Sequence, residues 1–314
     1  MSKKSGNNKI VIESINISEK KGEVKIPVES CEVDLLGLKN DAHRGHWHRQ
    51  VSLLDSERIE AFCRKSGTKI NPGEFAENIT LRGIDLDNVA ILDRFRIGPV
   101  VLEITQIGKK CHGDCTVFEL LGDCIMPKSG LFARVIEPGV IHKNDTVEYI
   151  PRPLSIKIIT LSDRASKGIY KDTSGPEIEK IVRNHFKKTR YHLDIQYLLI
   201  SDDPDKFQKA LSDSIETNAD FIFTTGGTGI GPRDFAPDVV LKMADKEIPG
   251  IMDHIRLKYG ASNPNALLSR SRAVLIKNTA VFTLPGSTKA VKEYMTEILT
   301  VAEHIFKMVH SIGH

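Results

Sequence analysis

The stretch FIFTTGGTGIGPRD, residues 221–234, decides the fold of the second half of the chain. Its first residues form the short apolar run that is typical of a buried strand, and a glycine-rich segment follows at once. A backbone without Cβ atoms can approach a ligand closely, and its N–H groups can form an anion-binding nest. The glycine spacing matches neither the phosphate-binding loop that ends in Gly-Lys-Ser/Thr nor the dinucleotide-binding fingerprint. The stretch therefore predicts a ligand-binding loop of another kind. The alternative is a tight turn that only joins the strand to its crossover.

Strands and helices alternate along the chain around this stretch. The predicted strands cover residues 155–161, 195–200, 221–224 and 279–284. The predicted helices cover residues 176–187, 204–218, 238–244, 251–259 and 289–310. Such alternation is typical of an α/β domain with a mostly parallel sheet that is covered on both faces. Because ligands of these sheets bind at the carboxyl ends of the strands, the loops after the strands form the candidate site.

The loops that follow the four predicted strands carry polar residues and glycines. The candidate site residues among them are Ser162, Asp163, Asp202, Thr225, Gly226, Gly227, Thr228, Gly229, Arg233, Asp234, Pro285, Gly286 and Ser287. Asp202 and Asp234 follow strands that we expect to be neighbours. Two carboxylates beside an anion-binding loop suggest Mg²⁺, which prefers oxygen ligands and bridges phosphates. For either aspartate alone, a turn or a helix cap is the better explanation, and Ser287 is also the expected N-cap of the last helix.

Length and composition indicate two globular modules. A chain of 314 residues suggests about two domains, and 40% hydrophobic with 27% charged residues excludes wholesale disorder. No apolar run approaches the ~20 residues of a membrane span. A net charge of +3 is too small to indicate a nucleic-acid binder. The polar residues 1–9 lack the apolar segment of a secretory signal, so we expect a cytoplasmic protein.

A proline-containing segment, residues 149–153, is the predicted boundary between two domains, because each proline forces its predecessor into an extended conformation. The predicted domains are residues 1–150 and 151–314. The first contains one predicted helix, residues 55–65, and predicted strands at 10–17, 24–28, 90–96, 100–107 and 131–137. Several strands at short spacing suggest a closed or nearly closed β-barrel. All five cysteines lie in this half, and their odd number without an export signal indicates reduced thiols.

Five motifs stand in order in the second half. They are SDRAS (162–166), TTGGTG (224–229), PRDFAP (232–237), LLSR (267–270) and LPGS (284–287). Together they resemble the MogA-like molybdopterin adenylyltransferases, over roughly residues 154–310; gephyrin carries a related domain. The resemblance implies a usually trimeric molybdopterin-binding fold that joins AMP from ATP to the terminal phosphate of molybdopterin, with Mg²⁺, and releases pyrophosphate. It implies that Asp202 and Asp234 are the functional aspartates and that Ser269 and Ser287 belong to the substrate-binding set.

Four motifs in the first half resemble a second family. They are DAHRGHWHRQVSLL (41–54), PGEFAENI (72–79), QIGKKCH (106–112) and GDCIMP (122–127). They are similar to the MOSC domains, named after the carboxyl-terminal module of molybdenum cofactor sulfurase. The resemblance implies a β-barrel-like fold and a link to molybdenum cofactor or to sulfur handling, such as a persulfide. It also implies that Cys111 is the characteristic cysteine.

The residues themselves leave the chemistry of this half open. Cationic neighbours of Cys111 favour a reactive thiolate. The alternatives are inert buried thiols or a structural zinc, whose ligands would be Cys111, His112, Cys115 and Cys124. His43, His46 and His48 alternate along the chain, which puts them on one face of an extended segment. Such a face could bind a metal, or it could be a solvated or anion-holding polar loop.

We therefore predict an enzyme of molybdenum cofactor biosynthesis. The C-terminal domain adenylylates molybdopterin with ATP and Mg²⁺, and the N-terminal domain binds a form of the cofactor or handles its sulfur. The expected partners are other proteins of molybdenum cofactor biosynthesis and further copies of the chain in a homotrimer, without nucleic acid or membrane. The alternative is a non-catalytic molybdopterin carrier or scaffold, because a fold can persist without its chemistry.

Overall fold

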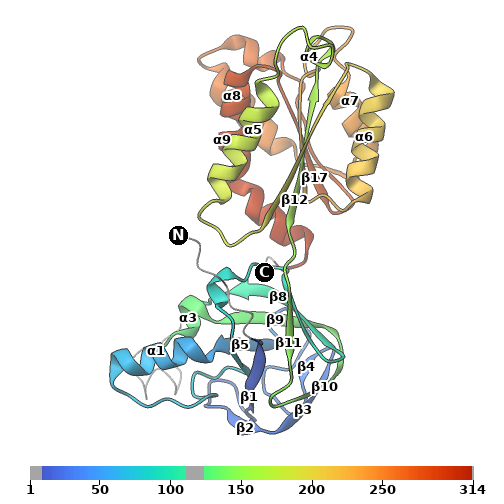
Figure 1. Cartoon of the computed structure of the whole chain (residues 1–314). Coiled ribbons are helices and arrows are strands. Elements are labelled where there is room, and N and C mark those ends of the chain that lie inside the picture. The colour runs from blue at the N-terminus through green and yellow to red at the C-terminus, as the bar shows by residue number, and fades with distance from the viewer. Residues whose placement is uncertain (1–8, 111–123, 313–314) are drawn as a thin grey trace. The chain divides into compact units, whose positions relative to one another are not determined.

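The computed structural model describes residues 9–110 and 124–312 of the chain (Figure 1). The contacts divide the chain into two compact units, Met1–Arg152 and Pro153–His314. The boundary between them lies within the proline-containing segment, residues 149–153. No helix among the described residues is long and apolar enough to cross a membrane.

The described part of the N-terminal unit contains two β-sheets and short helices. The strands are β1 (Val11–Ile17), β2 (Ile26–Val28), β3 (Ser30–Asp34), β4 (Gly37–Leu38), β5 (Val51–Asp55), β6 (Ile79–Arg82), β7 (Arg94–Ile97), β8 (Val100–Ile107), β9 (Leu131–Glu137), β10 (Gly139–His142) and β11 (Val147–Ile150). The helices are α1 (Ser56–Ser66), η1 (Leu86–Asn88) and α3 (Met126–Ser129). Eight strands form a sheet in the order β11-β7-β8-β9-β5-β6-β1-β2, and the other three are ordered β10-β3-β4. The larger sheet is mixed, because β5 and β6 pair in parallel while its other pairs are antiparallel.

Backbone hydrogen bonds connect the two end regions of the larger sheet. Ile12 N–H donates to Asp145 O at 3.0 Å, and Asn144 N–H donates to Ile12 O at 2.9 Å. Val147 N–H at the start of β11 donates to Ile10 O, just before β1, at 2.9 Å. The unit is therefore rich in sheet, as predicted, while full closure into a barrel stays a prediction.

Several elements of this unit lie where the sequence predicts them. Helix α1 follows its Asp55 cap, whose carboxylate accepts the N–H of Arg58 at 2.7 Å, and it ends at Gly67, where φ is 72°.

The start of the predicted strand 90–96 is wrong. Ala90 N–H donates to Asp93 Oδ2 at 2.7 Å in a turn, so β7 begins only after it. A local side-chain bond here overrides the β propensity of the segment.

The C-terminal unit contains a six-stranded sheet among its described residues. Its strands are β12 (Leu154–Leu161), β13 (Leu193–Ile200), β14 (Phe221–Thr225), β15 (Lys246–Glu247), β16 (Ala273–Ile276) and β17 (Thr279–Leu284). Their order is β13-β12-β14-β17-β16-β15. The first four are parallel, which confirms the α/β architecture, and β16 and β15 add an antiparallel edge that the sequence did not predict.

Helices cover both faces of this sheet (Figure 1). They are α4 (Asp163–Ser166), α5 (Ser174–Phe186), α6 (Pro204–Glu216), α7 (Ala236–Met243), α8 (Pro249–Gly260), η2 (Pro264–Leu268) and α9 (Thr288–Val309). Helices α5, α8 and α9 lie on one face, and α6 and α7 lie on the other. Ile159 and Ile222 pack against Phe207 of α6, while Phe223 stacks on Phe282 at 5.5 Å. Because both faces are covered, the central strands β14 and β17 are buried at every position.

The prediction that Asp202 and Asp234 follow neighbouring strands is wrong. Strand β12 lies between β13 and β14, so the loop after β12 separates the two aspartates. A crossover connection can place the next parallel strand on either side of the first, and residue periodicity does not record which side is used. The two loops still meet at the same carboxyl edge of the sheet.

Candidate functional site

The loop after β14 turns sharply at two glycines. The φ angles are 103° at Gly226 and 62° at Gly227, in the left-handed region that favours glycine. Gly226 N–H donates to Leu284 O at 3.0 Å. A Cβ atom at Gly226 would collide with Leu161 O. The loop is therefore held against the ends of β12 and β17, where a side chain has no room.

Two aspartates join the loops that follow β12 and β13. Asp163 N–H donates to Asp202 Oδ2 at 3.0 Å, and Asp202 N–H donates to Asp163 Oδ1 at 3.1 Å. Ser162 caps α4, because its Oγ accepts the N–H of Ala165 at 3.2 Å. Each carboxylate thus fixes the backbone of the neighbouring loop and stays at the edge of the sheet.

Asp234 is folded back onto the glycine-rich loop. Its Oδ2 accepts Gly231 N–H at 2.9 Å, and its own N–H donates to Gly231 O at 3.0 Å. A Cβ atom at Gly229 would lie 2.7 Å from Asp234 Oδ2, so glycine lets this carboxylate approach the loop closely. The side chain of Arg233 is 83% exposed, with Nη1 3.6 Å from Asp163 Oδ2. Such an exposed pair is weak, so the guanidinium is available to a ligand.

Arg270 holds the same loop from the other side. Its Nε donates to Gly229 O at 2.8 Å, and its Nη2 donates to the carbonyl oxygen of Asp234. Its Nη1 donates to Asp238 Oδ1 at 2.8 Å. The planar guanidinium therefore connects two points of the loop between β14 and α7 with the first turn of α7. The predicted site residues include Ser269 of the LLSR motif but not its neighbour Arg270, although an arginine in the same motif was a usable signal.

These loops surround a pocket of about 310 Å³. Its lining consists of Leu161, Ser162, Asp202, Gly227, Gly231, Pro232, Arg233 and Asp234. Two carboxylates, a guanidinium and glycine backbone therefore face one space, which suits a polyanion together with a metal ion. Five of the lining residues are predicted site residues, and Leu161, Gly231 and Pro232 were missed.

Asp172, a carboxylate outside the predicted site, anchors the segment between α4 and α5. Asp172 Oδ2 accepts hydrogen bonds from Thr160 Oγ1 at 2.9 Å and from Tyr197 OH at 2.8 Å. Burial opposes ionisation, but hydrogen bonds outweigh it and lower the pKa of Asp172. Burial and this carboxylate raise the pKa of Tyr197 to about 12. On the same segment, Tyr170 OH lies 2.8 Å from Oγ of the pocket residue Ser162, so the anchored segment supports the pocket wall.

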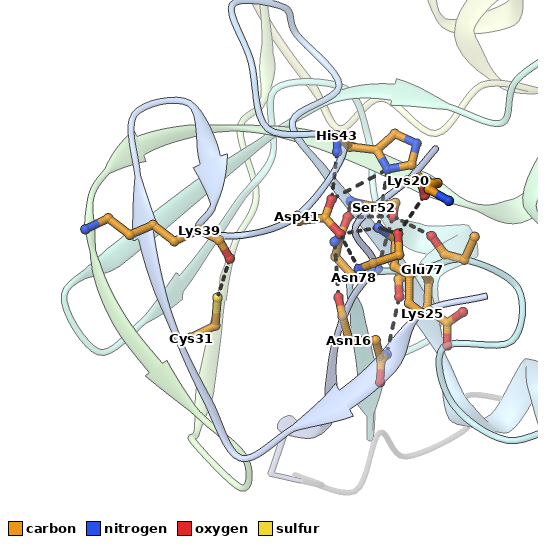
Figure 2. Close-up of polar contacts among 12 residues, drawn as sticks. Asn16, Lys20, Lys25, Cys31, Lys39, Asp41, His43, Ser52, Glu77 and Asn78 are labelled. Atoms are coloured by element: carbon orange, nitrogen blue, oxygen red, sulfur yellow. Dashed lines mark hydrogen bonds and ion pairs between the residues drawn. The ribbon is translucent and has the colours of Figure 1, made fainter. Parts of the chain in front are cut away.

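The N-terminal unit holds a buried ion pair between Lys25 and Asp41, next to His43 (Figure 2). Lys25 Nζ pairs with Asp41 Oδ2, and both side chains are almost fully buried. Nζ also lies 3.3 Å from Ser18 Oγ and 3.3 Å from His43 Nδ1. Burial lowers the pKa of Lys25 against the opposing effect of Asp41. Burial also acts to raise the pKa of Asp41, but His43 and Lys25 outweigh it and hold that pKa below its usual range.

Both units match known protein families. Residues 157–304 match the family described as a probable molybdopterin binding domain, and residues 40–148 match the MOSC domain. The molybdopterin adenylyltransferase of Haemophilus influenzae is 36% identical over 141 residues, which are 45% of this chain and 70% of the relative. That of Escherichia coli K12 is 32% identical over 160 residues, 51% of this chain and 80% of the relative. The chain belongs to the molybdopterin adenylyltransferase family.

Both resemblances stated from the sequence are thereby confirmed. Gephyrin of Dictyostelium discoideum is also 32% identical over 162 residues, half of this chain, but the match covers 22% of that longer protein. The adenylyltransferase similarity falls on the C-terminal unit, which carries the pocket.

The other predicted residues of the adenylyltransferase-type unit do not line the pocket. They are Asp163, Thr225, Gly226, Thr228, Gly229, Ser269, Pro285, Gly286 and Ser287. Thr225 is buried, and its Oγ1 donates to Pro285 O at 2.8 Å. Ser287 Oγ accepts the N–H of Ala290 at 3.2 Å, so the predicted capping role is confirmed. Ser269 Oγ lies 2.9 Å from the hydroxyl of Ser271. These residues shape the loops, and any contact with substrate would lie beyond the pocket.

The cysteine chemistry predicted for the MOSC-type unit falls outside the described residues, because Cys111, His112 and Cys115 lie there. Cys31 is buried, and burial raises the pKa of its thiol. Among the residues that the structure describes, no three histidine, cysteine, aspartate or glutamate side chains form a group that could hold a metal ion. His43, His46 and His48 therefore do not form a three-histidine metal site.

Proposed function

We propose that the C-terminal unit transfers AMP from ATP to the terminal phosphate of molybdopterin, as a step of molybdenum cofactor biosynthesis. The observation that carries the proposal is the pocket at the carboxyl edge of the sheet, where Asp202 and Asp234 face the glycine-rich loop. Family membership supports it, since the relatives that match this unit are named molybdopterin adenylyltransferases.

The main obstacle to this reaction is charge. An oxygen of the molybdopterin phosphate attacks the α-phosphorus of ATP, the bond from that phosphorus to the β-bridging oxygen breaks, and pyrophosphate leaves. Both reactants are anions, so the site must neutralise and align them. The guanidinium of Arg233 and the N–H groups of the glycine-rich loop supply positive charge. A general base is hardly required, because a phosphate monoester is already largely ionised near neutral pH.

Asp202 and Asp234 are the residues that would hold Mg²⁺. Each uses Oδ2 to accept a backbone N–H. Within the described residues Oδ1 of each accepts no hydrogen bond, so one oxygen of each carboxylate fits the hard cation. Mg²⁺ is usually bound by one or two carboxylates together with substrate phosphates. When bound, the ion neutralises phosphate charge.

For the N-terminal unit we propose binding of a cofactor form or handling of its sulfur at Cys111. The match to the MOSC domain supports this role. From the resemblance to the MogA-like adenylyltransferases we propose a homotrimer. We also propose a cytoplasmic location and other proteins of molybdenum cofactor biosynthesis as partners.

Pyrophosphate release tests the proposed activity. The full chain with ATP, Mg²⁺ and molybdopterin should release pyrophosphate in proportion to the molybdopterin added, and little without it. A carrier or scaffold would bind molybdopterin, measured by its absorbance after gel filtration, without releasing pyrophosphate. That result would contradict the proposed enzyme activity and support the non-catalytic carrier.

A further inference from the structure

Three side chains of the N-terminal unit gather around Trp47, the one tryptophan of the chain. The ring of His43 is stacked on it, with centroids 6.2 Å apart and planes 11° from parallel. Lys21 Nζ lies 5.2 Å and Arg49 Cζ 4.9 Å from the centre of the Trp47 ring. Trp47 Nε1–H donates to His43 O at 2.7 Å. We call Lys21, His43, Trp47 and Arg49 the Trp47 cluster.

The buried ion pair Lys25–Asp41 contacts Nδ1 of His43. Lys25 Nζ has three neighbours that can accept a hydrogen bond: Asp41 Oδ2, Ser18 Oγ and His43 Nδ1. Nδ1 of His43 also lies 3.5 Å from Asp41 Oδ1, so it either accepts a hydrogen bond from the Lys25 ammonium or donates one to the Asp41 carboxylate. When it accepts from Lys25, the neutral ring carries its proton on Nε2. Figure 2 shows the Nδ1 side of the ring facing Lys25 and Asp41.

The backbone fixes the same ring in place. His43 N–H donates to Asp41 Oδ1 at 2.9 Å, and the His43 side chain is 26% exposed. A rigid imidazole that accepts at Nδ1 presents Nε2–H as a donor away from the ion pair.

The cations of the cluster lack acidic partners. In the described part of the chain neither Lys21 nor Arg49 forms an ion pair, and Nε of Arg49 is buried without a hydrogen-bond acceptor. A buried donor without an acceptor is costly and calls for an explanation. By contrast, Arg44 on the same segment pairs with Asp34, with Nη2 2.5 Å from Oδ2. The cluster therefore combines uncompensated positive charge with unused N–H donors.

We propose that the Trp47 cluster binds a tetrahedral oxyanion, with Arg49, Lys21 and His43 Nε2–H as its donors. An oxyanion supplies the acceptors that these groups lack, and charge-assisted bonds from guanidinium to phosphate are among the stronger ones. The anion is either a free ion or the phosphate of a larger molecule. The proposal stands on the N-terminal unit alone and does not depend on adenylyl transfer.

The fluorescence of Trp47 provides a direct test, because a chain with one tryptophan reports from this cluster alone. The full chain is titrated with inorganic phosphate and, separately, with AMP, against potassium chloride at matched ionic strength. A saturable change in emission is expected with at least one of the two anions. A tighter apparent Kd for AMP identifies a phosphate monoester as the ligand type, and an equal or tighter Kd for phosphate identifies the free ion.

Two variants and a matched control sharpen the test. Arg49→Gln and Lys21→Gln should each raise the apparent Kd on the order of 10-fold, the loss of one charge-assisted bond. Lys21 is exposed, so its variant should fold even if Arg49→Gln does not. Arg44→Gln removes the same charge from the same segment and should change Kd less than about twofold. Emission that follows ionic strength alone, or equal effects of all three variants, would overturn the proposal.

Discussion

At the scale of single residues, the carboxylates of the pocket each have a structural and a chemical task. Asp234 holds Gly231 N–H with one oxygen and faces the pocket. The same division applies to Asp202, which holds the backbone of Asp163. Removing the charge without removing the hydrogen-bond acceptor separates the two tasks.

Asp234→Asn should lower kcat for pyrophosphate release on the order of 10²-fold or more, because it removes one electrostatic group from the site. The amide oxygen can still accept Gly231 N–H, so the urea midpoint should stay close to that of the parent protein. Asp205→Asn, the same change at an exposed position of α6, is the matched control and should leave kcat unchanged. Parental turnover by the Asp234 variant would contradict the proposed role.

Gly226→Ala should destabilise the C-terminal unit more than Gly168→Ala. Both glycines have positive φ, 103° and 71°, which costs a non-glycine residue about 1–3 kcal/mol. Only at Gly226 does the added Cβ also collide with Leu161 O, since nothing lies within 4 Å of the Cβ position at Gly168. Urea unfolding measures the difference, and equal losses would show that the loop moves aside freely.

At the scale of elements, the segment between α4 and α5 depends on one ionised side chain. Asp172 bonds to β12 through Thr160 and to β13 through Tyr197. A carboxylate whose folded pKa is lowered stabilises the fold at pH values above its unfolded pKa. The contribution is lost as the pH falls through the lower, folded pKa.

Asp172→Asn should therefore reduce the free energy of unfolding by about 1–2 kcal/mol at neutral pH, the value of about one charge-assisted hydrogen bond. The difference from the parent protein should be constant between about pH 5 and 7 and shrink below the unfolded value of 3.8. Urea unfolding at several pH values measures it, with Asp205→Asn as the control for charge. If the difference in the free energy of unfolding grew on acidification, the pKa of Asp172 would be raised in the folded protein, contrary to the assigned direction.

At the scale of the whole molecule, each unit has its own apolar core. A fragment of residues 153–314 should fold alone, because the chain divides into compact units at this boundary. Light scattering at micromolar concentration should show a trimer of this fragment if the family's usual assembly applies. A well-folded monomer that still releases pyrophosphate would support the proposed activity and contradict the proposed trimer.

The sequence by itself determined the kinds of element and the edge of the sheet that carries the site. Apolar runs followed by glycine and polar residues are local patterns, so the strands β12, β14 and β17 and the pocket loops were predictable. The caps Asp55 and Ser287 were predictable for the same reason, because a cap acts within three residues of itself. The family resemblances rest on motifs that are equally local.

Only the tertiary structure decided which distant residues meet. Asp163 with Asp202, Asp172 with Tyr197, and Lys25 with Asp41 and His43 are bonds between different segments. The position of β12 between β13 and β14 was likewise decided only by the tertiary structure. Periodicity along a strand or helix records which face of an element is buried, but it does not record which neighbour covers that face. Strand order and side-chain pairing depend on how the chain crosses over, and that is settled only when the whole core packs.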